Sequence, residues 1–131
     1  MRHGLIDRLV VVLSVVLVAA GALFALGANV SGEGRVEAIL ELEPDIERGR
    51  EVYNEIAQPA CAACHSFRDA GASSVIASDL DELQPSARVS AQSLIGGGIS
   101  GHDREDYEHE LSNQDIADVV RYIERFAGEG S

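Results

Sequence analysis

The sequence predicts an all-α protein in which one N-terminal transmembrane helix precedes a small helical domain. Three observations support this fold class. The only polar side chain between Leu9 and Ala28 is Ser14, residues 112–126 place apolar side chains at helical spacing, and no segment shows the alternation of a strand. A chain of 131 residues is long enough for one domain behind such a helix.

Residues 1–30 are expected to form a membrane anchor. The apolar run from Leu9 to Ala28 is long enough to span the roughly 30 Å of a bilayer core as a helix. Arg2 and Arg8 precede this run, which predicts a cytoplasmic N-terminus with the remaining chain on the periplasmic, extracytoplasmic side. A cleaved signal peptide is the alternative, but the run is longer than the about 7 to 15 apolar residues of such a peptide.

Residues 31–43 are expected to link the anchor to a domain at residues 44–128. The stretch Asn29–Gly34 is polar and contains glycine, which favours a hinge. The first helix of the domain is predicted to begin near Pro44, whose fixed φ suits a first turn, and to end at the Gln58–Pro59 step. Its apolar face is expected to consist of Ile46, Gly49, Val52, Tyr53 and Ile56.

The next segment, Cys61-Ala62-Ala63-Cys64-His65, contains the only two cysteines of the chain. The pattern C-x-x-C-H is typical of covalent c-type haem attachment, because two thiols at this spacing reach the two vinyl groups of one porphyrin. We therefore predict that Cys61 and Cys64 bind one covalent haem c and that His65 is an axial ligand of its iron. A zinc half-site and a redox-active cysteine pair are the alternatives. Zinc would need two further ligands, and a redox pair would follow a βαβ pattern.

Beyond this motif, residues 66–83 are rich in glycine, serine and alanine and are predicted to form a loop that wraps the haem. Ser86–Leu94 is predicted to be a short helix stopped by the glycines at 96–98. The last helix is expected to begin after Ser112, with Asp115 completing a capping box. Its apolar stripe, closed by Gly128, consists of Ile116, Val119, Val120, Ile123 and Phe126.

The net charge restricts the partners. The chain carries −12, and residues 31–131 combine eight arginines with 21 acidic residues, a net charge of −13, without any lysine. Such a surface is not expected to bind nucleic acid or anionic lipid, whereas it would attract a basic patch on a redox partner protein. The alternative is that the acidity serves solubility at high salt, where counter-ions screen self-repulsion.

Together, these features resemble the small bacterial class I monohaem cytochromes c over residues 44–127. The resemblance rests on Gly49-x-x-Val52-Tyr53, the C-x-x-C-H motif, Asp69–Ala72, Asp79–Leu83, Val89-x-x-Gln92 before the glycine run, and Leu111–Ile123 in the last helix. It implies that the first and last helices cross near Gly49, Tyr53 and Tyr122, and that the function is single-electron transfer between partners.

The chain departs from this family at the second axial ligand, which is normally a methionine shortly after the glycine run. The only methionine is Met1, and Ser100 falls near the expected position. The segment from residue 99 to residue 110 is longer than in the family and carries two histidines, so we predict a bis-histidine haem with His102 as the second ligand and His109 as second choice. A further departure is Ser78, where the family has a proline whose carbonyl accepts a hydrogen bond from the proximal imidazole.

These observations predict a monohaem c-type cytochrome at the outer face of the cytoplasmic membrane. It is expected to be a tethered, single-pass electron carrier or a subunit of a respiratory or photosynthetic complex. We expect an electron-transfer protein rather than an enzyme, because the sequence shows no acid–base pair, nucleophile or phosphate-binding loop. The alternative is a five-coordinate haem protein that binds a diatomic gas or acts as a sensor.

Overall fold

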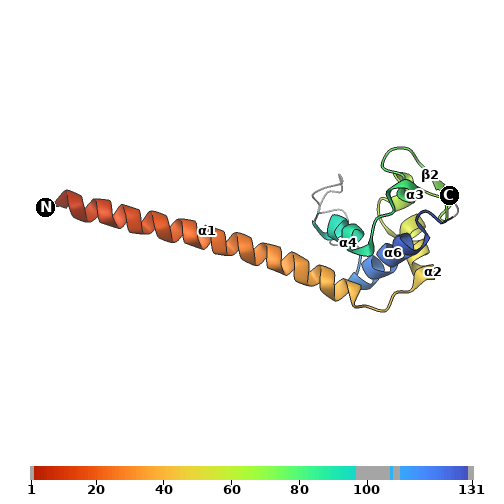
Figure 1. Cartoon of the computed structure of the whole chain (residues 1–131), viewed down its shortest axis with the longest axis horizontal. Coiled ribbons are helices and arrows are strands. Elements are labelled where there is room, and N and C mark those ends of the chain that lie inside the picture. Colours follow the sequence, from red (N-terminus) through yellow and green to blue (C-terminus); the bar gives the residue numbers. More distant parts are fainter. Residues whose placement is uncertain (1, 97–106, 108–109, 130–131) are drawn as a thin grey trace. The chain divides into compact units, whose positions relative to one another are not determined.

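The computed structural model describes residues 2–96, 107 and 110–129. The chain divides into two units, Met1–Gly34 and Arg35–Ser131, and each is considered by itself. Helix α1 (Arg2–Leu40) begins in the first unit and ends in the second. The second unit also contains α2 (Ile46–Glu51), the π-helical turn η1 (Val52–Ile56), the 3₁₀ turn η2 (Cys61–Ala63), β1 (Ser66–Phe67), β2 (Ala72–Ser73), α3 (Leu80–Leu83), α4 (Ala87–Gly96) and α6 (Asn113–Phe126) (Figure 1).

In the first unit, α1 exposes large apolar side chains between Val10 and Val18. Ser14, the polar residue within this stretch, donates its hydroxyl to the carbonyl of Val10 at 2.9 Å, so the helix itself satisfies this group. Within the described residues, no helix is long and apolar enough to cross a membrane. This finding does not support the transmembrane helix that the sequence predicts.

In the second unit, the last turns of α1 belong to the core. The sequence predicts a hinge and a linker here, but the helix continues to Leu40, and Val36 and Ile39 are buried. Two residues three positions apart share one face of a helix. Burial of that face offsets the low helix propensity of the two glycines that precede it. Most of the predicted linker is therefore the end of a longer helix, which stops at Leu40.

The first predicted helix of the domain has the expected position. Asp45 caps α2 by accepting a hydrogen bond from the backbone N–H of Arg48 at 3.1 Å. From Val52 the helix widens into the π-helical turn η1, closed by a hydrogen bond from the N–H of Ala57 to the carbonyl of Val52 at 3.1 Å. The turn ends one residue before the Gln58–Pro59 step and leads the chain to the cysteines.

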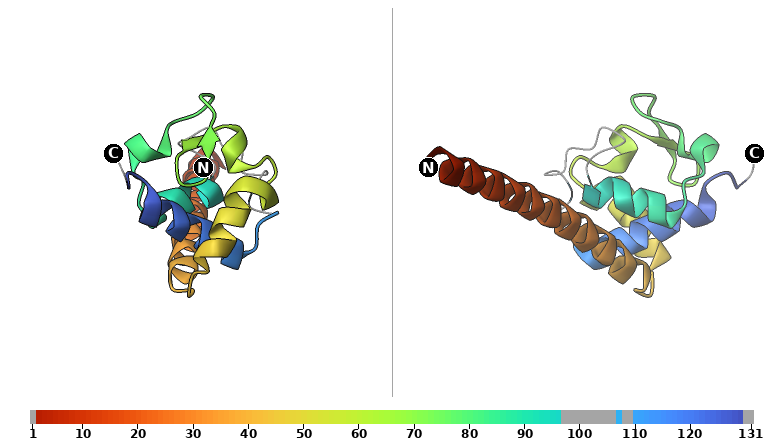
Figure 2. Two further views of the ribbon diagram at one scale, coloured as in Figure 1. Left: turned by 90° about the vertical axis from the view of Figure 1, so that its right-hand side faces the viewer. Right: turned by 60° about the vertical axis from the view of Figure 1, so that its left-hand side comes forward.

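Helices α2 and α6 lie side by side (Figure 2), and Gly49 allows their close approach. A Cβ atom at Gly49 would lie 2.7 Å from Cβ of Tyr122 and would also overlap the backbone carbonyl oxygen of Asp118. Only glycine fits this position without a shift of the helix backbone. The rings of Tyr53 and Tyr122 meet edge to face, with centroids 6.3 Å apart. The structure thus confirms the helix crossing that the family resemblance implies.

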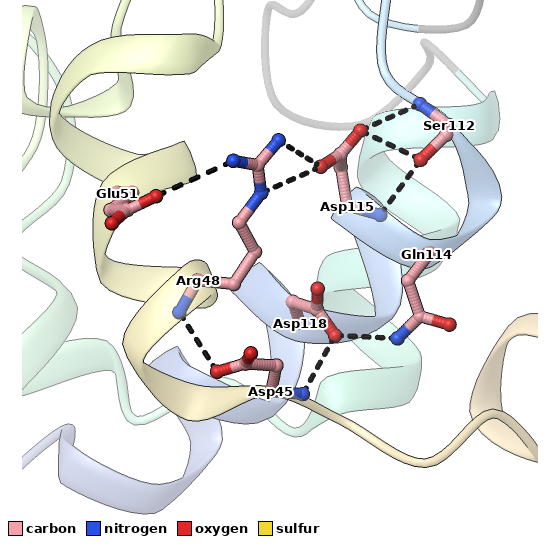
Figure 3. Close-up of polar contacts among 7 residues, drawn as sticks. All are labelled: Asp45, Arg48, Glu51, Ser112, Gln114, Asp115 and Asp118. Atoms are coloured by element: carbon pink, nitrogen blue, oxygen red, sulfur yellow. Dashed lines mark hydrogen bonds and ion pairs between the residues drawn. The ribbon is translucent and has the colours of Figure 1, made fainter.

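Polar contacts fasten α2 to the start of α6 (Figure 3). Nη2 of Arg48 lies 3.2 Å from Oδ1 of Asp115. The carboxylate of Asp118 is buried, and it accepts hydrogen bonds from the backbone N–H of Asp45 at 2.9 Å and from Nε2 of Gln114 at 2.7 Å. Both donors point at one carboxylate oxygen, so this buried polar group finds its hydrogen-bond partners within the crossing.

The last helix matches its prediction closely. Ser112 caps α6, because its hydroxyl oxygen accepts a hydrogen bond from the backbone N–H of Asp115. The carboxylate of Asp115 accepts a hydrogen bond from the backbone N–H of Ser112, which completes the capping box. Gly128, with φ of 81°, follows the helix. Helix α4 (Ala87–Gly96) runs two residues beyond the predicted Leu94.

The segment 66–83 is more structured than the predicted loop. Strands β1 and β2 pair antiparallel with Ser66 opposite Ser73, and Gly71 occupies the connecting turn with φ of 70°. Asp79 caps the single turn of α3 through the N–H groups of Asp81 and Glu82. The expectation of a chain without strands was wrong for this ladder, because two-residue strands are too short to show alternation.

Candidate functional site

The two cysteines lie at either end of one tight turn. The backbone N–H groups of Cys64 and His65 donate to the carbonyl of Cys61 at 3.1 Å and 2.9 Å. In a 3₁₀ turn, side chains three residues apart lie on the same side. The turn therefore brings both thiols to one side, immediately before the imidazole of His65.

Both thiols are free and half-buried. Burial raises the pKa of Cys61 to about 11, so this thiol is protonated at neutral pH and is a weak nucleophile by itself. A thioether bond removes the ionisable proton altogether.

The imidazole of His65 is oriented by a backbone group. Its Nδ1 lies 2.8 Å from the carbonyl oxygen of Ser78. Since a carbonyl can only accept, Nδ1 must carry the proton, and the ring's lone pair is then on Nε2. An imidazole held in this tautomer is suited to ligate a metal through Nε2.

Two further hydrogen bonds brace the turn. The N–H of Ala77 donates to the carbonyl of Cys64 at 2.8 Å, so residues 77 and 78 both bind the motif. From the other side, the hydroxyl of Tyr53 donates to the carbonyl of His65 at 3.2 Å. Burial raises the pKa of Tyr53 above its usual value, which keeps this donor protonated.

An aromatic cluster supports this region. The ring of Phe67 lies 5.4 Å from that of Tyr53 and 5.3 Å from that of Tyr122, measured between centroids. The hydroxyl of Tyr122 donates to Asp69 at 2.6 Å, and Arg50 pairs with the same carboxylate at 3.0 Å. The residues after His65 are thus tied to the crossing of α2 and α6.

Tyr107 connects the segment after the glycine run to the motif. Its side chain is buried, and its hydroxyl donates to the carbonyl of Pro59 at 2.8 Å. Pro59 lies two residues before Cys61. The residue five positions after His102 is therefore held next to the start of the cysteine turn.

The structure brings together Cys61, Cys64 and His65, as the motif predicts. The other two predicted ligands, His102 and His109, lie outside the described residues. Sequence reasoning missed Tyr107, although one large aromatic residue in a strongly acidic stretch is a recognisable sign of an anchor. The sequence analysis named Ser78 as a departure from the family. Because the acceptor is a backbone carbonyl, any residue type at this position can supply it.

This donor set fits a c-type haem. Two thiols on one side of a turn can form two thioethers to one macrocycle, and the neighbouring imidazole has its lone pair on the nitrogen that would face the iron. The apolar residues behind the turn, including the buried Phe67 and Leu80, provide an interior from which water is excluded.

Comparisons with known proteins agree with this reading of the site. The sequence profile of the cytochrome c family matches residues 46–126. Among solved structures, the chain is similar to the c-type cytochrome SorU from Sinorhizobium meliloti, with 31% identical residues and a TM-score of 0.55. The alignment covers 63% of this chain and 91% of that chain. No curated protein matches the chain.

Proposed function

The chain belongs to the cytochrome c family, and on this premise we propose that it is a monohaem electron carrier with its haem attached to Cys61 and Cys64 and ligated by His65. Covalently bound haem c is the cofactor of this family, and it supplies a one-electron iron couple. The observation that carries the assignment is the single turn Cys61–His65 with its imidazole oriented by Ser78.

The residues around the cysteine turn hold the ring of His65 and the backbone on both sides of it in one position. The carbonyl of Ser78 fixes the ring of His65 and increases its basicity as a ligand. The hydrogen bonds from Ala77 and Tyr53 restrain the backbone on both sides of that ring. A site restrained in this way changes little when an electron enters or leaves, which favours fast transfer.

For the second axial position we propose His102. The proposal rests on the absence of any methionine other than Met1 and on Tyr107, whose hydrogen bond to Pro59 keeps the following part of this segment beside the cysteine turn. Two imidazole ligands would give low-spin iron in both oxidation states and a lower potential than a methionine–histidine pair.

The missing methionine also supports a second candidate, a five-coordinate haem protein that binds a diatomic gas. The optical spectrum of the ferrous protein distinguishes the two. A low-spin spectrum with slow carbon monoxide binding supports ligation by His102, provided that exchange of His102 for Ala gives high-spin iron. A high-spin wild type that binds carbon monoxide rapidly supports the gas-binding candidate.

We propose that the haem domain works at the outer face of the cytoplasmic membrane, tethered by residues 1–30, as a carrier or as a subunit of a larger redox complex. The support is the apolar sequence from Leu9 to Ala28 and the exposure of the valine and leucine side chains from Val10 to Val18. Resistance to an alkaline carbonate wash would support tethering. A mature N-terminus beyond Ala22, found by mass spectrometry, would contradict it.

The carrier function is tested by a redox titration of the purified protein. Titrated with redox mediators over a wide range of potentials, the protein should show one reversible one-electron couple with a single set of isosbestic points. Absence of a reversible one-electron couple would exclude a carrier.

A further inference from the structure

The haem domain exposes two large apolar side chains next to each other. Val75 is 93% exposed and Ile76 is 76% exposed. Both belong to the segment between β2 and α3, which projects away from the helices of the domain in the views of Figure 2. Isolated exposed apolar residues are ordinary, but an adjacent pair of strongly exposed aliphatic residues in one loop favours a contact surface.

This pair, which we call the Val75–Ile76 tip, is joined to the haem-attachment turn. The residue after Ile76, Ala77, donates its N–H to the carbonyl of Cys64, and Ser78 accepts from the imidazole of His65. Two short hydrogen bonds, both of 2.8 Å, therefore fix the end of the loop to the residues that bind the cofactor. A molecule that covers the tip would therefore lie close to the residues that bind the cofactor.

The charge of the domain selects the molecule that can cover the tip. Residues 31–131 carry −13, and Asp79, Asp81 and Glu82 follow the tip directly in the chain. A second copy of the same chain would bring an equal negative charge, and an anionic lipid surface would be repelled as well. A partner that has apolar residues at the centre of its surface and lysine or arginine around them can cover the apolar tip and is attracted by the acidic domain.

We propose that the Val75–Ile76 tip is the apolar centre of the docking surface for a basic redox partner protein. The proposal rests on the electron-carrier function proposed above. Long-range attraction between the acidic domain and the basic partner brings the two proteins together, and burial of the tip then holds the complex long enough for one electron to pass. The reduced haem domain loses this electron, and the ferric partner gains it.

The test uses the full-length protein and a lysine-rich mitochondrial cytochrome c as basic partner, with hexaammineruthenium(III) as a cationic oxidant that has no apolar surface. In the variant Val75→Ser/Ile76→Ser, the second-order rate of electron transfer to the basic cytochrome should fall on the order of tenfold, because two aliphatic contacts are lost. The rate with hexaammineruthenium(III) should not change. Val89→Ser, which replaces a half-exposed valine on α4, is the matched control and should leave both rates unchanged.

The dependence of the electron-transfer rate on salt concentration separates the electrostatic attraction from the burial of the apolar tip. The substitutions change no charge, so the rates of wild type and variant should fall with ionic strength along parallel lines. Equal rates for wild type and variant would overturn the docking proposal while leaving the carrier function intact, and absence of a reversible one-electron couple in the redox titration would overturn the carrier function itself. A variant with an altered haem spectrum would show that the tip contacts the haem instead, which also overturns the proposal.

Discussion

Nδ1 of His65 lies 2.8 Å from the backbone carbonyl oxygen of Ser78. The hydrogen bond needs a carbonyl at this point of the backbone, and the hydrogen bond from Ala77 to Cys64 holds the backbone there. The orientation of the imidazole is therefore independent of the side chain at position 78.

The first prediction follows from this backbone contact. Ser78→Ala and Ser78→Pro should both keep the wild-type optical spectrum and reduction potential, because neither removes the carbonyl acceptor. Cyclic voltammetry and absorption spectra of the two variants are the measurement. A potential that changes in Ser78→Ala would show that the hydroxyl, rather than the carbonyl, acts on His65.

The second prediction concerns the crossing of α2 and α6. Gly49→Ala should lower the free energy of unfolding by about 1–3 kcal/mol, because the added Cβ meets Tyr122 and the backbone of Asp118. Gly34→Ala is the matched control, since a Cβ there meets nothing within 4 Å in the same helical conformation. It should be neutral or stabilising by up to about 1 kcal/mol. Urea unfolding followed by circular dichroism measures both, and equal effects would contradict the crossing.

The third prediction is a dependence of stability on pH. Burial by itself raises the pKa of Asp115, but hydrogen bonds from Ser112 and Arg48 outweigh it and lower the pKa below 3.8. A lowered pKa in the folded state means that the contribution of Asp115 is fully present above about pH 4 and is lost as the pH falls through the folded value.

Asp115→Asn should therefore weaken the loss of stability between about pH 4 and pH 2, roughly the range below the pKa of an unfolded aspartate. The measurement is the melting temperature across this range. Glu41→Gln, at an exposed carboxylate beyond the end of α1, is the control and should follow the wild-type curve. The assignment fails if the two variants have the same curve.

The fourth prediction concerns Tyr107. Tyr107→Phe should lower the free energy of unfolding by about 1–3 kcal/mol, because the carbonyl of Pro59 loses its partner. If His102 ligates the iron, the same change should also accelerate carbon monoxide binding to the ferrous protein, since the ligand's segment is less firmly held. Tyr53→Phe, which removes the hydrogen bond to the carbonyl of His65, should destabilise the protein without this acceleration. Unchanged binding in both variants would contradict the role of Tyr107.

The sequence predicted the parts of the fold that depend on local patterns. The capping box of Ser112 and Asp115 and the start of the first domain helix near Pro44 are set by residues a few positions apart, and both are present. Helix α1 was predicted less well, because a glycine-containing stretch was taken as a hinge. Burial of Val36 and Ile39 against distant elements keeps it helical, and such tertiary packing leaves no local pattern.

In the candidate site, too, the sequence predicts the local motif but not the contacts between distant residues. Cys61, Cys64 and His65 follow from a contiguous motif, whereas the contacts of Ser78 and Tyr107 join residues 13 and 48 positions apart. Backbone carbonyls act as acceptor in both contacts, and a carbonyl has no signature in the sequence. These two contacts are therefore visible only in the three-dimensional arrangement.

The central claim is that one haem is bound covalently through Cys61 and Cys64, and the mass of the denatured protein tests it most directly. After unfolding in acid and organic solvent, the wild type should retain the mass of the polypeptide plus one haem, and Cys61→Ala/Cys64→Ala should have the mass of the polypeptide alone. A wild-type protein that releases its haem into the organic phase and shows only the polypeptide mass would contradict the account.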